Sequence, residues 1–375
     1  MSNAEASPRP PYRLPRVKRE HQAVHRDDGT IQVGGDILGI ASVFDDPDGS
    51  LWQIIRLLDG TRSIEQLHTD SGQPRDTVAA LVEALYEGGF LEDAATQDST
   101  TLSAREQERY SRNQAFYRWI DLTPRPSPWT VQERIKAARV VVLGLGGGGS
   151  SVALALAASG VGNLHLVDHD RVELSNLTRQ FLYCEADIGR TKVDAAVARL
   201  RSVNSTITIT GEEAKVESIA DLSRLIENCD VLAMCADRPL KIRHWADTAC
   251  HQAGIPWVTG GYVGPVSTVQ ILARDGGACV ECMHLRSGEL SSDAPAVISE
   301  QDDPELLDND QVAASTAISA GMSGLMIAHG VLAHITGAPD FGGSFQFGMN
   351  LAAPEQQLYM TGDRHPQCPV CADRT

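Results

Sequence analysis

The stretch that decides the fold is residues 139–192, RVVVLGLGGGGSSVALALAASGVGNLHLVDHDRVELSNLTRQFLYCEADIGRTK. Residues 140–143 form a continuous apolar run, typical of a parallel strand that is buried on both faces. Gly144, Gly146 and Gly149 then match G-x-G-x-x-G, and Ser150 opens a run of small residues that predicts a helix. The free N–H groups at such a helix start can bind phosphate. A second apolar run, residues 164–167, ends at Asp168, where a carboxylate can bind a ribose hydroxyl. The sequence therefore predicts a mononucleotide-binding βαβ unit.

The residues after Asp168 favour ATP over a nicotinamide cofactor. A glycine pattern with a trailing acid most often binds NAD or FAD. Here, however, polar and charged residues follow closely: Asp170, Asn176, Arg179, Gln180 and Lys192. Hydride transfer needs an apolar floor, whereas a triphosphate with its metal needs cations and carboxylates. NAD binding stays open only if these cations bind a cofactor phosphate.

At this point the stretch resembles the adenylate-forming superfamily of ThiF, MoeB and the ubiquitin-activating enzymes. The matching motifs are GxGGxGS from Gly144 to Ser150, DxDxVxxSNLxRQ from Asp168 to Gln180, and a Gly-x-x-Lys that ends at Lys192. An apolar run that ends at Asp237 resembles the strand that presents the magnesium ligand in this superfamily. The resemblance covers about residues 105–375 and implies a Rossmann-like, ThiF-type α/β adenylation fold.

The resemblance also implies a role for each matched residue. Lys192, Arg179 and Asn176 would stabilise phosphate charge, and Asp237, with Asp170, would hold Mg²⁺. Arg112, in the segment Arg-Tyr-Ser-Arg of residues 109–112, matches an arginine finger that reaches the triphosphate across a homodimer. The family has Gln directly after that arginine, whereas this chain has Asn113, and it has Arg238 where an amide is common. The complete predicted nucleotide set is Gly144, Gly146, Gly147, Gly149, Asp168, Asp170, Ser175, Asn176, Arg179, Gln180, Lys192 and Asp237.

Two C-x-x-C pairs predict a structural zinc site. Cys279 and Cys282 form the first pair, and Cys368 and Cys371 form the second. Four thiolates make a closed tetrahedral zinc site with no position left for water. A redox C-x-x-C is the alternative interpretation.

The other cysteines do not suggest a covalent intermediate. Residues 284–311, the loop that carries the nucleophilic cysteine in thioester-forming relatives, contain no cysteine. Adenylation without an enzyme thioester is therefore expected. The remaining four thiols are expected to be buried and inert in strands or helices: Cys184, Cys229, Cys235 and Cys250.

The N-terminal part predicts a second, smaller domain. Residues 1–25 are expected to form a mobile basic arm. Residues 26–94 predict a winged-helix-like α+β domain, with a hairpin (30–33 and 37–43) followed by three helices. DNA binding is disfavoured, because residues 74–94 hold one arginine and five acidic residues. Residues 95–104 are predicted to be a linker, and residues 105–375 the adenylation domain.

The second domain resembles the PqqD-like precursor-recognition domains of peptide-modifying enzymes, in its layout and in the phrase LLDGTRSIEQL of residues 57–67. In that family a leader peptide adds a strand to the hairpin edge and packs against a helix.

Composition excludes other classes of protein. The formal net charge of −17 disfavours nucleic acid as a partner. No apolar run of membrane-spanning length and no signal peptide is evident, and the paired C-x-x-C usage suits a reducing compartment, so a cytoplasmic protein without a membrane partner is expected.

The predicted reaction is attack of a peptide carboxylate on the α-phosphate of ATP, with ATP, Mg²⁺ and Zn²⁺ as cofactors. The layout resembles the microcin-type adenylating enzymes, so maturation of a ribosomally made peptide is the main hypothesis. Two alternatives remain: activation of the C-terminus of a small sulfur-carrier protein, and a catalytically silent partner that delivers leader peptide to a cyclodehydratase.

Overall fold

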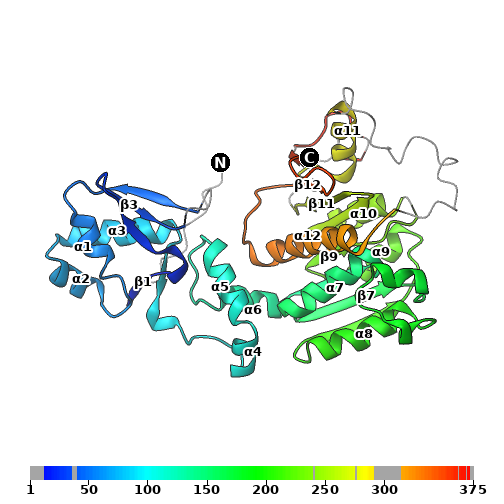
Figure 1. Ribbon diagram of the computed structural model, residues 1–375, viewed down its shortest axis with the longest axis horizontal. Coiled ribbons are helices and arrows are strands. Elements are labelled where there is room, and N and C mark those ends of the chain that lie inside the picture. The colour runs from blue at the N-terminus through cyan, green and yellow to red at the C-terminus, as the bar shows by residue number, and fades with distance from the viewer. Residues whose placement is uncertain are drawn as a thin grey trace. The chain divides into compact units, whose positions relative to one another are not determined.

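Figure 1 shows the computed structural model of the chain, which describes residues 12–35, 40–239, 241–274, 277–290, 314–361, 363–368 and 370–371. The chain divides into two compact units. The first ends at Arg134 and includes Gly337–Pro339, and the second consists of Ile135–Thr336 and Asp340–Thr375. Most of the predicted loop 284–311 lies outside the described residues, as does the start of the predicted strand 37–43.

The second unit is built on a mixed sheet of eight strands in the order β13-β12-β11-β10-β9-β6-β7-β8. Strands β10, β9, β6, β7 and β8 run parallel, and β11, β12 and β13 continue the sheet antiparallel to their neighbours. The strands are β6 (Arg139–Leu143), β7 (Asn163–Asp168), β8 (Thr208–Glu213), β9 (Val231–Met234), β10 (Trp257–Val263), β11 (Val266–Leu272), β12 (Phe345–Asn350) and β13 (Gln357–Thr361). This topology confirms the predicted Rossmann-like α/β fold.

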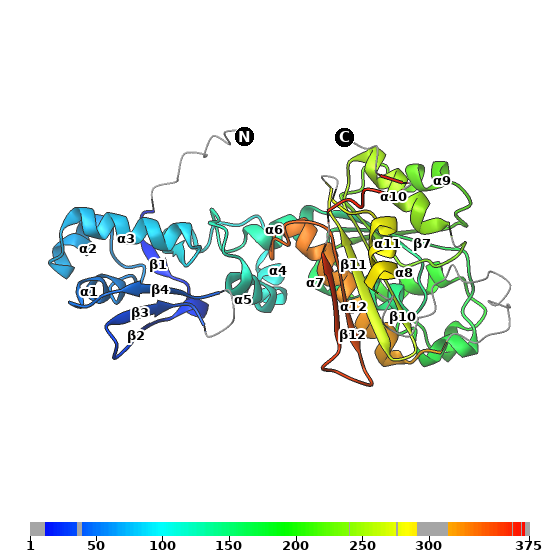
Figure 2. The ribbon, with the colours of Figure 1, turned by 90° about the horizontal axis from the view of Figure 1, so that it is seen from above.

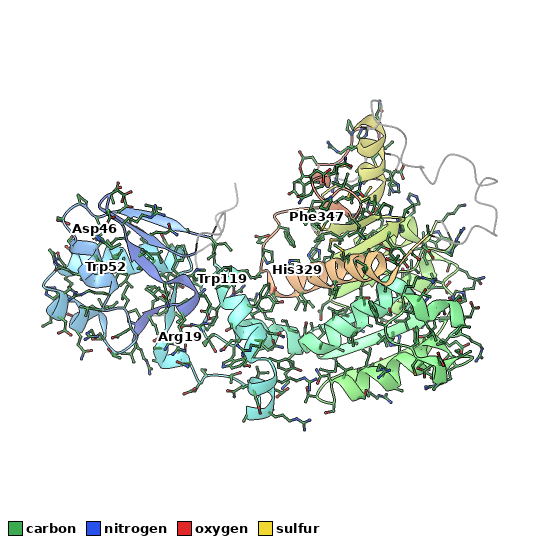
Figure 3. The ribbon with its side chains drawn as sticks, viewed as in Figure 1. Arg19, Asp46, Trp52, Trp119, His329 and Phe347 are labelled. Atoms are coloured by element: carbon green, nitrogen blue, oxygen red, sulfur yellow. The ribbon has the colours of Figure 1, made fainter. Side chains whose placement is uncertain are left out.

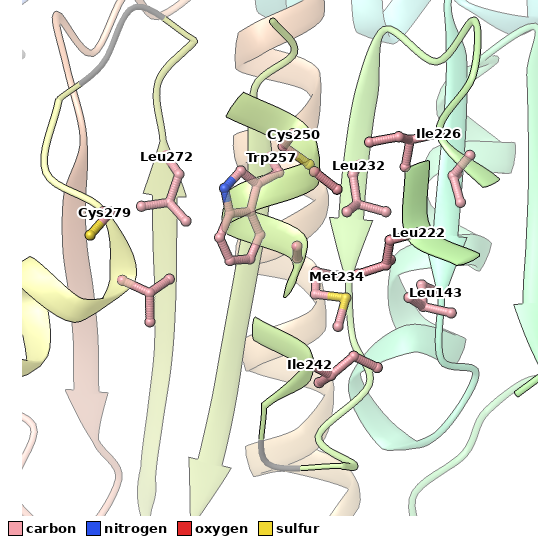
Figure 4. Close-up of a cluster of buried hydrophobic side chains, with 14 of the residues drawn as sticks. Leu143, Leu222, Ile226, Leu232, Met234, Ile242, Cys250, Trp257, Leu272 and Cys279 are labelled. Carbon is pink, nitrogen blue, oxygen red and sulfur yellow. The ribbon is translucent and has the colours of Figure 1, made fainter. Parts of the chain in front are cut away.

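Helices cover both faces of this sheet. Helix α12 (Ala317–Thr336) lies beside α7 (Gly147–Ser159) and against β10 and β11 (Figure 2). Helix α8 (Lys192–Val203) packs on β7 and β8. On the other side, α9 (Ile219–Leu225) and α10 (Ile242–Ala253) bury a cluster that includes Leu143, Leu232 and Trp257 (Figure 4). Cys279 directly precedes helix α11 (Val280–Leu290), and Cys282 lies within it.

Helix α12 is long and apolar enough to cross a membrane, yet it packs within the second unit. Its small residues allow a close approach to α7, since a Cβ on Gly324 would overlap the carbonyl oxygen of Gly148. Val331 and Ile327 are fully or almost fully buried. The apolar character of this helix is therefore explained by burial against the sheet and α7.

The first unit contains the predicted hairpin and three helices. Strands β2 (Ala23–His25), β3 (Thr30–Val33) and β4 (Ser42–Asp45) form an antiparallel sheet, and α1 (Ser50–Ile55), α2 (Ile64–Ser71) and α3 (Arg75–Glu87) follow. Ser63 forms the predicted capping box with Gln66. At the start of α1, the carboxylate of Asp46 accepts hydrogen bonds from the N–H groups of Leu51 and Trp52 (Figure 3).

The predicted mobile arm of residues 1–25 is wrong from residue 12 onward. Strand β1 (Pro15–Val17) pairs with β5 (Leu91–Asp93), and β2 pairs with β3. His21, in the short helix η1 (Arg19–His21), is fully buried. Residues that looked like solvated charge in the sequence have buried partners, because β5 and α5 lie over them.

The predicted linker of residues 95–104 is likewise not a boundary. A short helix, η2 (Ala94–Thr96), directly follows β5. Ser103 caps α4 (Ala104–Arg109), which continues into α5 (Ser111–Ile120), and the unit boundary falls inside α6 (Thr130–Ala137).

Ionic contacts hold α5 against the strands of the first unit. Arg118 on α5 donates to Glu92 of β5 at 2.8 Å, and both side chains are nearly buried. Glu92 also pairs with Arg16 of β1 at 2.7 Å. Lys18 donates to the carbonyl oxygen of Asp121 at 2.8 Å. Because breaking a buried ion pair is strongly destabilising, α5 is fixed to the small sheet domain.

Candidate active site

The glycine loop lies between β6 and α7, at the carboxyl end of the parallel strands. Gly144 has φ +90°, a conformation that side chains with a Cβ rarely adopt. A Cβ on Gly149 would overlap the carbonyl oxygen of Gly144. Gly146 differs from both, because a Cβ there would meet no described atom within 4 Å. The fold therefore requires Gly144 and Gly149, whereas Gly146 leaves open space at the start of α7, where a ligand phosphate can approach.

Two acidic residues follow β7, the neighbouring strand. Asp168 is buried, and its carboxylate accepts the N–H of Leu145 at 2.6 Å and that of Asp170 at 2.8 Å. Asp170 forms an ion pair with the buried Lys192, with Nζ and Oδ2 2.7 Å apart. The ammonium group of Lys192 is thus held beside the end of β7.

The segment after β7 presents Arg179 and Gln180. At the start of the short helix η3 (Leu174–Thr178), the side-chain oxygen of Asn176 accepts the N–H of the N-cap residue Glu173. Arg179 donates to the carbonyl oxygen of Ser175 at 3.1 Å. Gln180 is buried, and its Oε1 accepts no hydrogen bond from the described part of the chain. A second short helix, η4 (Glu185–Asp187), leads to α8.

Tyr262 is a residue of the site that the sequence analysis missed. It lies near the end of β10, and a Cβ on Gly147 would overlap its hydroxyl oxygen. Burial raises the pKa of Tyr262. The positive charge of Arg179 offsets part of this rise, and the negative charge of Asp237 adds to it. The signal that could have indicated it is a tyrosine directly after Gly260 and Gly261 on a strand beside β9.

The remaining predicted residues fall into two groups. Asp237 and Arg238 follow β9 and are both exposed. Arg112 is exposed on α5, in the first unit, whereas every other predicted nucleotide residue lies in the second. The roles of these residues toward a nucleotide stay predictions.

The four predicted metal ligands form one buried cluster. The sulfur atoms of Cys279, Cys282, Cys368 and Cys371 all lie within 4.8 Å of one another. Three of the S–S distances are 3.6, 3.5 and 3.2 Å. Ligands at about 2.3 Å from a tetrahedral zinc would be about 3.8 Å apart. The N–H of His365 also points to the sulfur of Cys282 at 3.2 Å. The donor set therefore fits a structural zinc ion.

Of the other cysteines, Cys250 lies buried in α10 as predicted, whereas Cys229 and the half-buried Cys235 flank β9 and lie in no strand or helix. Burial raises the pKa of Cys229 to about 11 and that of Cys235 to about 12, and it raises the pKa of Cys250 as well. These thiols stay protonated and unreactive near neutral pH. Cys184 departs furthest from the prediction, because it is exposed in the loop before η4. The prediction of a buried Cys184 is wrong, since its segment leaves the sheet after β7.

A model of the ThiF family matches residues 110–370. The chain belongs to the ThiF family. This match begins within the first unit of the structure and extends through almost all of the second. It confirms the predicted superfamily.

Named relatives of this ThiF-family chain are adenylyltransferases. The molybdopterin-synthase adenylyltransferase of Escherichia coli K12 is 35% identical over 189 residues, which are 50% of this chain and 72% of the relative. The Arabidopsis thaliana adenylyltransferase and sulfurtransferase MOCS3 is 31% identical over 226 residues, 59% of this chain and 48% of that protein.

Solved structures of E. coli MccB share the whole fold. One superimposes with a TM-score of 0.78 at 24% identity and covers 96% of this chain and 98% of MccB. Other structures contain MccB with ATP, and MccB, a microcin C7 biosynthetic enzyme, with the N-formylated peptide MccA. At this identity the likeness shows the fold, which includes both units.

Proposed function

We propose that this ThiF-family adenylyltransferase activates a carboxylate of a ribosomally made peptide. A carboxylate oxygen attacks the α-phosphorus of ATP, and a new P–O bond forms. The bond from the α-phosphorus to the bridging oxygen breaks, and pyrophosphate leaves with the electron pair. The product is an acyl-adenylate. An ionised carboxylate needs no general base.

The observation that carries this proposal is the convergence of groups at the carboxyl ends of β6, β7, β9 and β10. The glycine loop has N–H groups at the start of α7. Lys192, held by Asp170, and Arg179, held by the carbonyl of Ser175, would supply positive charge to the phosphates. Developing charge on the transferred phosphate is stabilised by such preorganised donors. Asp168, which accepts the N–H of Leu145 in the loop, would bind ribose.

Magnesium, the partner arginine and the homodimer belong to the proposal. Asp237, with Asp170, would hold Mg²⁺, which neutralises phosphate charge when bound. Arg112 of a second copy would neutralise the leaving pyrophosphate.

The four-cysteine cluster would hold a structural zinc ion. Four sulfur ligands leave no open coordination position. Its role would be to join α11 to the segment around Cys368 and Cys371, and it would take no part in the chemistry.

The first unit would recognise the precursor peptide. Its three-stranded sheet has two edges, β2 and β4, and each edge strand exposes an apolar side chain, Val24 and Val43, on the two sides of Gln32. A leader peptide that adds a strand at one edge would gain main-chain hydrogen bonds and an apolar contact. A cytoplasmic setting, where precursor peptides are made, fits this role.

The test combines calorimetry with ATP and pyrophosphate exchange with candidate precursor peptides. We expect magnesium-dependent ATP binding, lost in Arg179→Ala, and exchange that requires a peptide carboxylate. Asp237→Ala should abolish exchange and leave peptide affinity intact. The matched variant Val43→Asp should weaken peptide binding and leave ATP binding unchanged. Binding of NAD in place of ATP would overturn the proposal.

A sulfur-carrier substrate is the second candidate, because the molybdopterin-synthase adenylyltransferase is 35% identical. Exchange that is driven by a small carrier protein with a C-terminal glycine, and by no precursor peptide, would establish this alternative. A protein that binds leader peptide but no ATP would be the silent delivery partner.

A further inference from the structure

Leu145 is the one residue between Gly144 and Gly149 that has a side chain, and both polar groups of its backbone are hydrogen-bonded. Its N–H donates to the carboxylate of Asp168 at 2.6 Å, and its carbonyl oxygen accepts the hydroxyl of Tyr183 at 3.0 Å. Leu145 is fully buried, and Tyr183 is nearly so. These two contacts fix the orientation of the peptide groups on both sides of Leu145.

Tyr183 belongs to the segment that follows η3. Its N–H donates to the carbonyl oxygen of Gln180 at 3.3 Å, and the N–H of Gln180 donates to that of Asn176 at 3.0 Å. Burial raises the pKa of Tyr183, and the charge of Asp168 adds to this rise. The phenol therefore stays protonated near neutral pH, and its hydroxyl remains a donor to the glycine loop.

The contact with Tyr183 sets the direction of the next N–H group of the loop. The peptide bond between Leu145 and Gly146 is trans, and in a planar trans peptide the C=O and N–H groups point in opposite directions. Because the carbonyl of Leu145 points at Tyr183, the N–H of Gly146 points away from it. Gly146 is the N-cap residue of α7, and its carbonyl oxygen accepts the N–H of Ser150 at 2.9 Å. The N–H of Gly146 is therefore one of the four at a helix start that have no partner within the helix.

We propose that Tyr183 is a positioning residue that holds the peptide between Leu145 and Gly146, so that the N–H of Gly146 faces a phosphate of the bound nucleotide. The proposal rests on the proposed function. A ligand can approach, because a Cβ on Gly146 would meet no described atom within 4 Å. Without the hydroxyl, the buried carbonyl of Leu145 would lose its donor, which is unfavourable. The peptide would then be free to rotate toward another donor and would turn the N–H of Gly146 away from the phosphate.

The test compares Tyr183→Phe with Tyr359→Phe, a control at an exposed tyrosine of β13. Tyr183→Phe keeps the ring and loses only the hydroxyl. Calorimetry measures the Kd for ATP directly and, by competition, the Kd for adenosine, which has no phosphate. We expect Tyr183→Phe to raise the Kd for ATP about 5- to 50-fold and to change the Kd for adenosine less than about 2-fold, because only a phosphate meets the N–H of Gly146. Tyr359→Phe should match the parent for both ligands.

Two results would overturn the proposal. An unchanged Kd for ATP in Tyr183→Phe would show that the hydroxyl has no effect on the phosphate. Equal losses of ATP and adenosine binding would show that Tyr183 only supports the fold of the whole site. Melting temperatures show whether each variant is folded.

A mutant cycle with Gly146→Ala tests whether Tyr183 acts through Gly146. If it does, Tyr183→Phe has little further effect on the Kd for ATP once Gly146→Ala is present. Additive losses would contradict this route.

The proposed function can fail separately from the role of Tyr183. If the parent protein binds NAD in place of ATP, it is not the proposed adenylating enzyme. The comparison of NAD with adenosine then decides the role of Tyr183, because NAD has a pyrophosphate that binds at the same helix start. A parent protein that binds neither nucleotide would overturn both proposals.

Discussion

Removal of the second cysteine pair should cost the second unit a large part of its stability. The sulfur atoms of Cys279 and Cys368 are adjacent in space but 89 residues apart in sequence. A zinc ion bound by both cysteine pairs would cross-link the chain and close a loop of this length. Such a cross-link removes chain entropy worth about 4.6 kcal/mol from the unfolded state. For a unit of this size, such a loss lowers the melting temperature by about 9–18 °C.

The assay is differential scanning calorimetry of the double variant Cys368→Ser/Cys371→Ser, together with zinc analysis of each protein. The parent should contain one zinc ion per chain, and the double variant none. A chelator should shift the parent toward the double variant. Cys184→Ser is the matched control, because Cys184 lies outside the cluster, and it should keep both zinc and stability. A double variant that melts within about 2 °C of the parent would refute the reasoning.

Three further predictions concern single residues. Gly149→Ala should destabilise the fold by about 1–3 kcal/mol in thermal unfolding, because the new methyl group overlaps the Gly144 carbonyl, whereas Gly146→Ala should keep stability and weaken only ATP binding. Lys192→Met should raise the Kd for ATP, measured by calorimetry, about 10- to 100-fold, because the charged hydrogen bond from Lys192 to a phosphate is lost. An unchanged Kd would show that Lys192 does not contact ATP. Burial lowers the pKa of His334 in the folded protein to about 4. As the pH falls, this histidine therefore takes up a proton in the unfolded protein before it does so in the folded protein. Between pH 7 and pH 5, denaturant titration should show a loss of about 2 kcal/mol, and His334→Gln should reduce that loss.

The fold and the cysteine cluster could be predicted from the sequence because local patterns determine them. A strand followed by Gly144 and Gly149 forms a tight turn whatever surrounds it, and two C-x-x-C pairs need one another to share a metal. The three helices after the hairpin also have local signals, such as the capping box at Ser63.

Features that depend on distant contacts could not be predicted. Residues 12–25 look like a charged tail because their partners, Glu92 and Asp121, are far away in sequence. Tyr262 carries no motif, and only the packing of β10 beside the glycine loop brings its hydroxyl to Gly147. The exposure of Cys184 follows from the course of a loop, which no residue pattern indicated.

The ionic contacts around Arg118 have a consequence for protein engineering. A chimera that exchanges residues 1–94 would separate Glu92 from Arg118 and Lys18 from the backbone carbonyl of Asp121. Breaking the nearly buried ion pair of Glu92 and Arg118 alone costs about 3–5 kcal/mol. A chimera that exchanges the first unit up to Arg134 keeps these pairs together. It also transfers the α5 helix that carries Arg112. A transplant of the proposed peptide-binding unit would therefore also bring the donor's counterpart of Arg112, the proposed arginine finger.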